Sequence, residues 1–411
     1  MRSGVTIFTN YGRRLCNFQL IPVLFHSKGT LSGQHSINGD KLQHCAMSAS
    51  PHKELRVTFL GPLASFSHQA ALDLFPTSTT TTTSTTRTVT LLPKPSFADA
   101  FAAIQSTEAD YAVIPFENST NGSVVQTLDL LADRDGRYHD IVVCGEYYLT
   151  VHHCLLVRNE DAASDPETIY PRISKLYTHP QAWGQCEVFL SKHFRGIERK
   201  DTPSTSRAAS IVAKYGSTTA PIPTPTPGTG GNGGGDNATG NDSEGIPAAI
   251  ASSFAATHHN LSILAANIED RADNTTRFLV LRNRNSERTR EGEGEGGDFY
   301  PTATATSSTD TTTTTTVAPP TKLKSLISFM INHETPGALV DALTIFRRHG
   351  LNLTSIVSRP GQIRPWQYIF FVECERVRGV HEEDVVEKAM EELEGKTSCC
   401  RDLGSWEGRL G

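Results

Sequence analysis

The chain has 411 residues, enough for two or three domains, although stretches rich in Thr, Pro and Gly reduce the length available for packed cores. The formal net charge of -6 excludes a broad basic surface, so we expect neither a nucleic-acid nor an anionic-membrane partner. No apolar run in the sequence approaches the roughly 20 residues that a membrane-spanning helix needs.

Residues 1–46 carry four basic residues before the first acidic one, Asp40, a composition that resembles a mitochondrial presequence. The alternative is that translation starts at Met47, which leads almost directly into the first predicted strand, as a cytosolic N-terminus does. We favour this start and a cytoplasmic protein, with a mitochondrial location left open if residues 1–46 are translated. In both cases we expect residues 1–52 to lie outside the fold.

The first predicted elements belong to an α/β unit. A strand over residues 55–60 is followed by a helix that Ser65 or Ser67 can cap. The Thr-rich stretch over about 77–88 is interpreted as an insertion in a surface loop, because the entropy of loop closure grows slowly with length. Residues 97–106 then predict a helix with one apolar face.

The continuous apolar run 111–114 predicts a strand covered on both faces, ended by Pro115. A polar turn over 116–122 follows, and then a helix in which Ser123 and Gln126 form a capping box. Polar groups between a buried strand and a helix N-terminus are typical of ligand sites in α/β proteins. The alternative is a turn whose side chains serve only the turn itself.

Strands at 141–143 and 149–157 are expected to cross into a second lobe. Two further polar turns, at 178–181 and 202–205, also precede predicted helices. Because the first N–H groups of a helix lack partners within it, all three turns lie where N–H donors are available to a ligand. The sequence therefore places three polar turns at predicted helix N-termini.

The next segments differ sharply in composition. Residues 217–246 are rich in Pro, Thr and Gly, and we expect disorder there. Residues 248–256 predict a helix of small residues. The motif N-T-T-R-F at 274–278 leads into the apolar strand 279–281, and residues 283–322 predict a flexible linker.

A compact unit over 323–407 ends the chain. Its predicted order is strand, helix, strand, strand, helix, strand, with the first helix beginning at Pro336 and ending near Gly350, which can adopt the left-handed stop. This order predicts an antiparallel sheet with both helices on one face.

Taken together, these motifs resemble the prephenate dehydratase family, which makes phenylpyruvate on the route to phenylalanine. The resemblance rests on G-P-L-A-S-F-S-H-Q-A-A at 61–71, I-P-F-E-N-S-T-N-G-S-V at 114–124, T-L-D-L-L at 127–131, T-H-P-Q-A at 178–182, A-A-I-A-S at 248–252 and N-T-T-R-F at 274–278. The terminal unit resembles the regulatory ACT domain of these enzymes, through P-G-A-L at 336–339 and S-R-P at 358–360.

The resemblance implies an α/β fold with a catalytic region over 53–282. This region would have two lobes similar to type II periplasmic binding proteins, with the active site in the cleft between them. A linker over 283–322 and a βαββαβ ACT domain over 323–407 would follow. The implied reaction is the decarboxylating dehydration of prephenate, and no metal or organic cofactor is implied.

The resemblance also implies site residues. Thr276 would be the essential hydroxyl that acts on the leaving group, Glu117 would orient it, and Asn118 would help to position the substrate. For Arg277, a structural ion pair is an alternative to substrate binding. The residues expected to bind substrate are Ser119, Thr127, Gln181, Ser204, Thr205 and Arg277.

Feedback inhibition by phenylalanine is a further expectation. The residues expected to bind it are Gly337, Ala338, Leu339, Ser358, Arg359 and Pro360. Val357 stands where the family signature has Glu, which puts one contact in doubt. We expect a homodimer or larger homo-oligomer. The alternatives for function are arogenate dehydratase and a non-catalytic amino-acid sensor.

Overall fold

The computed structural model describes residues 54–76, 88–163, 165–215, 245–290, 322–377 and 384–408. The expected N-terminal extension, the Thr-rich and Gly-rich insertions and most of the expected linker lie outside the described residues. Within these described ranges, no helix is long and apolar enough to cross a membrane.

The first sheet has the strand order β2-β1-β3-β11-β5, and a short β4 pairs with β3. β1 is parallel to β2 and β3, whereas β11 is antiparallel to both β3 and β5. The elements of this lobe are β1 (Leu55–Leu60), α1 (Phe66–Leu74), β2 (Val89–Lys94), α2 (Phe97–Gln105), β3 (Tyr111–Asn118), β4 (Gly122–Ser123), α3 (Val125–Ala132), β5 (Ile141–Thr150), β11 (Thr275–Asn283) and α8 (Glu287–Arg290). The predicted first strand, the helix capped by Ser65 and the helix from Phe97 are confirmed.

β3 does not end at Pro115 as predicted, but continues to Asn118. Proline has no N–H to donate to a neighbouring strand and is tolerated in sheets mainly at edges and irregularities. Here Pro115 pairs with Phe278 beside a register shift between Arg277 and Phe278, so the irregularity accommodates it. The extension of β3 carries Asn118 to the position opposite Thr276.

The predicted capping box at Ser123 is also wrong. Ser123 belongs to β4, where it pairs with Glu117, and the N-cap of α3 is Val124, which makes no side-chain capping hydrogen bond. The buried face of α3 is formed by Thr127, Leu128 and Leu131. The N-terminus of α3 is therefore left without a side-chain cap.

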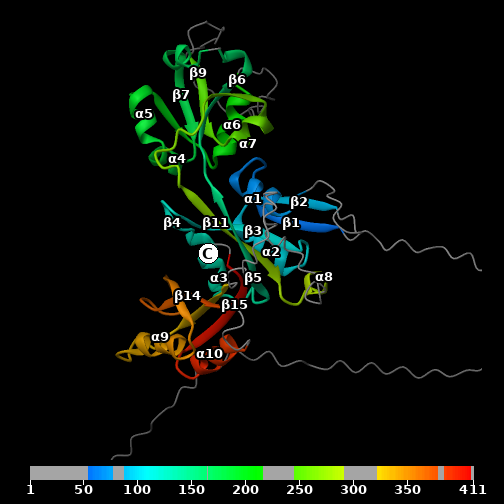
Figure 1. Cartoon of the computed structure of the whole chain (residues 1–411), viewed down its shortest axis with the longest axis vertical. Coiled ribbons are helices and arrows are strands. Elements are labelled where there is room, and N and C mark those ends of the chain that lie inside the picture. Colours follow the sequence, from blue (N-terminus) through cyan, green and yellow to red (C-terminus); the bar gives the residue numbers. More distant parts are fainter. Residues whose placement is uncertain are drawn as a thin grey trace, which may run out of the picture. The chain divides into compact units, whose positions relative to one another are not determined.

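The second sheet has the order β10-β6-β9-β7-β8, and Figure 1 shows α4, α5, α6 and α7 around it. Its elements are β6 (Cys154–Arg158), η1 (Asn159–Asp161), η2 (Pro166–Thr168), η3 (Tyr170–Arg172), β7 (Ile173–Thr178), α4 (Pro180–Gln185), α5 (Glu187–His193), β8 (Glu198–Asp201), α6 (Thr205–Ala213), β9 (Ile246–Ala251), α7 (Ser253–His259) and β10 (Leu261–Ala265). The predicted small-residue helix over 248–256 is wrong in its first half, where residues 248–251 belong to β9, and confirmed in its second half, which is part of α7. Alanine favours helix in isolation, but β9 is wholly buried between β6 and β7, where packing decides the conformation.

The C-terminal unit has the predicted order: β12 (Lys322–Met330), α9 (Ala338–Arg348), β13 (Asn352–Pro360), β14 (Tyr368–Val377), α10 (Val385–Glu394) and β15 (Cys399–Glu407). All strand pairs are antiparallel, in the order β13-β14-β12-β15. Both helices pack in one cluster on one face of this sheet. α9 begins at Ala338, two residues after the predicted start, and Gly350 adopts φ 70 as expected for a left-handed stop.

The opposite face of the C-terminal sheet packs on the first sheet. Leu326, Phe371 and Leu403 share one buried cluster with apolar residues of α2, α3, β3, β5 and β11. Gly404, with φ 115, lets β15 approach β5, because a Cβ there would collide with the backbone of Val143. The C-terminal unit and the first lobe are therefore held together by a continuous apolar core.

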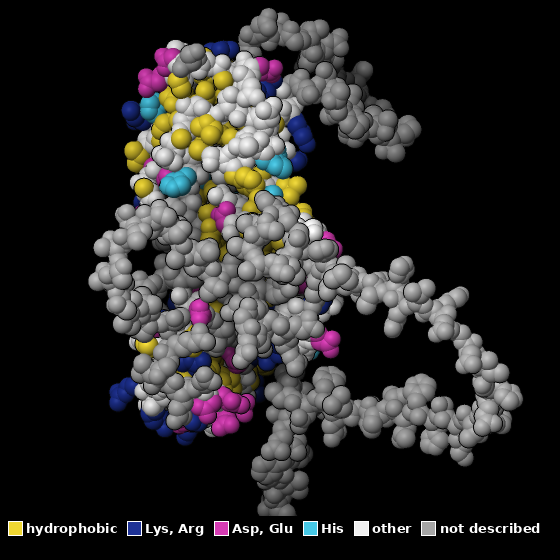
Figure 2. All heavy atoms as spheres, turned by 45° about the vertical axis from the view of Figure 1, so that its right-hand side comes forward, with side chains coloured by type: hydrophobic (Ala, Val, Ile, Leu, Met, Phe, Trp, Pro, Cys, Tyr) yellow, Lys and Arg dark blue, Asp and Glu magenta, His cyan; other side chains and the backbone are white. Residues whose placement is uncertain are grey.

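Residues 283–290, expected in the linker, are instead part of the fold. β11 runs to Asn283, and α8 follows at Glu287–Arg290. Arg288 is bound to Asp110, which also binds Arg56. On the part of the surface coloured in Figure 2, Lys and Arg are interspersed with Asp and Glu and form no continuous basic surface.

Candidate active site

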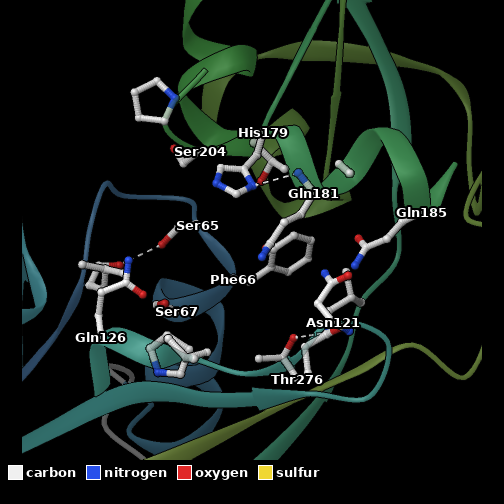
Figure 3. Close-up of a pocket in the computed structure, with 18 of the residues that line it drawn as sticks. Ser65, Phe66, Ser67, Asn121, Gln126, His179, Gln181, Gln185, Ser204 and Thr276 are labelled. Carbon is white, nitrogen blue, oxygen red and sulfur yellow. Dashed lines mark hydrogen bonds between the residues drawn. The ribbon is translucent and has the colours of Figure 1, made fainter. Parts of the chain in front are cut away.

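A cavity of ≈ 570 Å³ is lined by residues from both lobes. Residues at the N-termini of four helices contribute to it, namely Ser65, Phe66 and Ser67 of α1, Val124, Val125 and Gln126 of α3, His179, Gln181 and Ala182 of α4, and Ser204 and Thr205 of α6. Figure 3 shows the labelled side chains facing this common space from different elements. Because helix N-termini carry unpaired N–H groups and a partial positive charge, this arrangement favours an anionic ligand.

Five of the residues predicted from the sequence line the cavity: Asn118, Gln181, Ser204, Thr205 and Thr276. The Nδ2 of Asn118 lies 3.0 Å from the Oγ1 of Thr276 and donates to it. Residues that pair directly across antiparallel strands share a face of the sheet, and the register of β3 and β11 pairs these two residues. Residues 158 positions apart in the chain therefore meet in one hydrogen bond.

The orientation of the Asn118 amide follows from its other contacts. Its Oδ1 accepts hydrogen bonds from the backbone N–H groups of Thr120 (3.0 Å) and Asn121 (2.9 Å). Backbone N–H groups can only donate, so the nitrogen of the amide must face Thr276. Thr276 then accepts from Asn118 and keeps its own hydroxyl proton for a ligand in the cavity.

The structure separates Glu117 and Arg277 from the cavity. They pair with each other across β3 and β11 and therefore share the face of the sheet opposite to Thr276. Neither lines the cavity. Arg277 is 7% exposed and its Nη2 lies 2.6 Å from Glu146 and 2.7 Å from Glu373, so the ion-pair alternative describes its contacts.

Thr127 and Ser119 also lie outside the cavity lining and support the surrounding backbone. Thr127 is fully buried and donates to the carbonyl of Pro115 at 2.7 Å, which ties α3 to β3. The Oγ of Ser119 accepts from the N–H of Thr275 at 2.9 Å. Both therefore position the strands that carry Asn118 and Thr276.

Among the residues that the structure describes, no Lys, Arg, Asp or Glu lines the cavity. Two imidazoles are present, and burial lowers the pKa of both. The hydrogen bond to Gln185 raises the pKa of His153, but by less than burial lowers it. The negative charge of Asp201 raises the pKa of His179, again by less than burial lowers it. Both side chains are therefore neutral near pH 7, and the cavity offers hydrogen bonds and helix N-termini rather than formal charges.

Sequence reasoning missed several lining residues, including Ser67, Gln126, His153 and Gln185. The Nε2 of His153, the residue just before β6, lies 2.8 Å from the Oε1 of Gln185 at the end of α4, and both residues line the cavity. The polar turns pointed to the right junctions, but sequence could not show which side chains of each helix face inward. Ser67 and Gln126 could have been found as polar residues in the first turn of their helices.

The residues expected to bind phenylalanine lie at two places in the C-terminal unit. Gly337 is the N-cap of α9, with Ala338 and Leu339 next to it, and Ser358, Arg359 and Pro360 end β13. Arg359 is bound to both carboxylate oxygens of Asp129 in α3 at 3.0 Å, and Arg134 donates to the carbonyl of Pro360. The end of β13 is thus attached to the helix whose N-terminus lines the cavity.

The fold and site define a two-lobed α/β protein whose cavity suits a small anionic ligand. Comparison with known proteins identifies the family. The profile of prephenate dehydratase matches residues 57–286. A bifunctional chorismate mutase/prephenate dehydratase of Aquifex aeolicus is 32% identical over 87% of this chain and 75% of its own length. A probable prephenate dehydratase of Saccharomyces cerevisiae is 31% identical over 78% of this chain and 87% of its own length.

A solved structure of prephenate dehydratase from Arthrobacter aurescens, in complex with L-Phe, superposes with a TM-score of 0.57 at 22% identity, covering 86% of this chain and 89% of that one. This likeness shows a shared mixed α/β fold. The chain belongs to the prephenate dehydratase family, as its motifs predict. The family match and the names of these relatives also confirm the prediction that the protein is an enzyme of this kind.

Proposed function

We propose that the protein converts prephenate to phenylpyruvate, water and carbon dioxide in the cavity between its two lobes, with Thr276 as the donor to the departing hydroxyl. The observation that carries this proposal is the hydrogen bond from Asn118 to Thr276, because it leaves the hydroxyl proton of Thr276 available to the substrate. Glu117 and Arg277 have no direct part in this proposal, since they lie on the other face of the sheet.

The reaction needs little covalent chemistry from the protein. As the bond to the ring carboxylate breaks, its electron pair moves into the ring, the double bonds shift, and the pair of the C–O bond leaves with the hydroxide, which is protonated to water. The ring becomes aromatic. Thr276 stabilises the charge that develops on the departing oxygen. Gln181, Ser204 and Thr205 bind the substrate together with the helix N-termini, which suit its two carboxylates.

We further propose that the protein prefers prephenate over arogenate, which carries an ammonium group in place of the ketone. A buried ammonium group is matched most strongly by a carboxylate. Within the described ranges, no Asp or Glu lines the cavity. We therefore expect a higher kcat/KM for prephenate. The test is the formation of phenylpyruvate from prephenate and of phenylalanine from arogenate by the purified protein; a higher kcat/KM for arogenate would overturn this preference.

The C-terminal unit is proposed to be an ACT domain that binds phenylalanine and inhibits the enzyme. Its βαββαβ order supports the assignment, and the solved relative from Arthrobacter aurescens is a complex with L-Phe. The attachment of Arg359 to Asp129 would carry the effect to α3. A dose-response of dehydratase activity against phenylalanine tests this regulation, and a flat curve would contradict it.

We also propose a two-lobed catalytic region of the type II periplasmic-binding-protein kind, a homo-oligomer and a cytoplasmic location. The catalytic lobes resemble type II periplasmic binding proteins in having two sheets that the chain crosses between twice, through β5 to β6 and through β10 to β11. β13 is an edge strand of the C-terminal sheet, which supports a homodimer or larger homo-oligomer through sheet edges. Light scattering tests the oligomer, and microscopy of a tagged protein tests a cytoplasmic location.

A further inference from the structure

A buried group of four charges lies where the C-terminal sheet meets the first sheet. Its members, here called the charge quartet, are Glu146 of β5, Arg277 of β11, Lys324 of β12 and Glu373 of β14. Their exposed fractions are 0%, 7%, 7% and 4%, in that order. Two positive and two negative groups balance, which is the condition under which charges tolerate burial.

Each charge of the quartet contacts both charges of opposite sign. The Nη2 of Arg277 lies 2.6 Å from Glu146 Oε2 and 2.7 Å from Glu373 Oε2. The Nζ of Lys324 lies 3.2 Å from Glu146 Oε1 and 3.4 Å from Glu373 Oε1. Tyr148 donates to Glu146 at 3.2 Å and accepts from Lys324 at 3.3 Å. Two members come from the catalytic region and two from the C-terminal unit.

Arg277 is the member that connects this interface to the active site, because it follows Thr276 directly in β11. Successive residues of a strand point to opposite faces, so Thr276 faces the cavity while Arg277 faces the C-terminal sheet. The register shift between Arg277 and Phe278 interrupts the pairing of β11 with β3 at this point. The pairing of β11 with β5 is regular at this point, so the ion-paired side chain of Arg277 adds a further constraint on the backbone next to Thr276.

We propose that Arg277 is a positioning residue for Thr276, and that Glu373 of the C-terminal unit holds Arg277 in place. The proposal rests on the proposed role of Thr276 in the reaction. In this proposal the C-terminal unit helps to align the active site through the contact between Glu373 and Arg277. This contact is separate from the attachment of Arg359 to Asp129. Apolar packing at the same interface holds the two units together but contacts β11 only through Leu279 and Leu281, farther along the strand.

The first test is Glu373→Gln, which keeps the shape and removes the charge opposite Arg277. We expect kcat for prephenate to fall by about 10²-fold, the effect of displacing a catalytic group by about 1 Å, with KM unchanged because Arg277 does not line the cavity. The matched control is Arg284→Ala, which removes a 3.0 Å hydrogen bond from the exposed Arg284, just beyond β11, to the carbonyl of Asp402. This control should keep wild-type kcat.

Loss of a buried charge can also destabilise the fold, so a second variant separates the two effects. Glu373→Gln combined with Lys324→Met leaves one positive and one negative group, Arg277 and Glu146, and restores the balance. We expect this variant to recover the melting temperature but to keep the low kcat, because Arg277 still lacks its partner in the C-terminal unit. Recovery of kcat together with stability would overturn the proposal.

A double-mutant cycle with Thr276→Val tests whether the effect passes through Thr276. If it does, Glu373→Gln lowers kcat in the wild-type background and has no further effect in the Thr276→Val background. Multiplicative losses would show that Glu373 acts independently of Thr276 and would overturn the inference. A Thr276→Val variant with wild-type turnover would instead contradict the proposed role of Thr276, so the two failures can be told apart.

Discussion

Replacing Asn118 by Asp should prevent Thr276 from donating its hydroxyl proton to the substrate, although Thr276 itself is unchanged. The substitution keeps the oxygen that accepts from the backbone of Thr120 and Asn121, so the turn is preserved. It replaces the nitrogen that donates to Thr276 by a second acceptor. The hydroxyl of Thr276 must then donate to the carboxylate at position 118, and its proton is no longer available to the departing hydroxyl of the substrate.

The expected loss is that of one oriented donor in the transition state, about 10²–10³-fold in kcat, or about 3–4 kcal/mol. The assay is the initial rate of phenylpyruvate formation at saturating prephenate, with the melting temperature measured on the same samples. In the Thr276→Val background Asn118→Asp should lower kcat much less, because only the hydrogen bonds from Asn118 to Asn274 and to the carbonyl of Thr275 remain to be lost. Near-normal kcat in a folded Asn118→Asp variant would refute the assignment of the hydrogen-bond directions.

Three predictions concern stability. Burial alone would raise the pKa of Asp110, but hydrogen bonds from Arg288 and Arg56 outweigh it and hold that pKa below the usual value. The carboxylate of Asp110 therefore stabilises the fold above its unfolded pKa of about 3.9 and loses this contribution as pH falls through the lower folded pKa. Calorimetry should show Asp110→Asn less stable than wild type at pH 7, with the difference shrinking below about pH 4; a constant difference would contradict this. Leu403→Ala, at a fully buried position, should lower the free energy of unfolding by about 2–5 kcal/mol in urea titrations, whereas Ile363→Ala, 63% exposed, should change it little. Gly404→Ala should also destabilise, since a Cβ collides with the backbone of Val143, and an unchanged urea midpoint would rule out that close approach.

Local sequence signals predicted the elements whose own residues determine their conformation. The cap at Ser65 and the left-handed stop at Gly350 lie where they were expected, because each depends on contacts within a few residues. Elements decided by distant partners were not predictable in this way. β9 has the composition of a helix and becomes a strand because β6 and β7 bury it on both sides.

In the candidate site, too, local motifs were predictable from the sequence and contacts between distant segments were not. The motifs placed Asn118 and Thr276 together correctly, but no sequence signal gave the register that pairs them. That register also turns Glu117 and Arg277 to the opposite face, although each adjoins a residue of the cavity. The partner of Arg277, Glu373, lies in a different structural unit, and only the packing of the C-terminal sheet on β5 and β11 brings them together.

The central claim is that the hydroxyl of Thr276 acts on prephenate in this cavity. The most direct measurement compares phenylpyruvate formation by the wild type, Thr276→Ser and Thr276→Val at saturating prephenate. Serine keeps the hydroxyl and should retain most of the turnover, whereas valine keeps the shape and should lose about 10²–10³-fold in kcat with little change in melting temperature. Wild-type turnover by a folded Thr276→Val variant would contradict the claim.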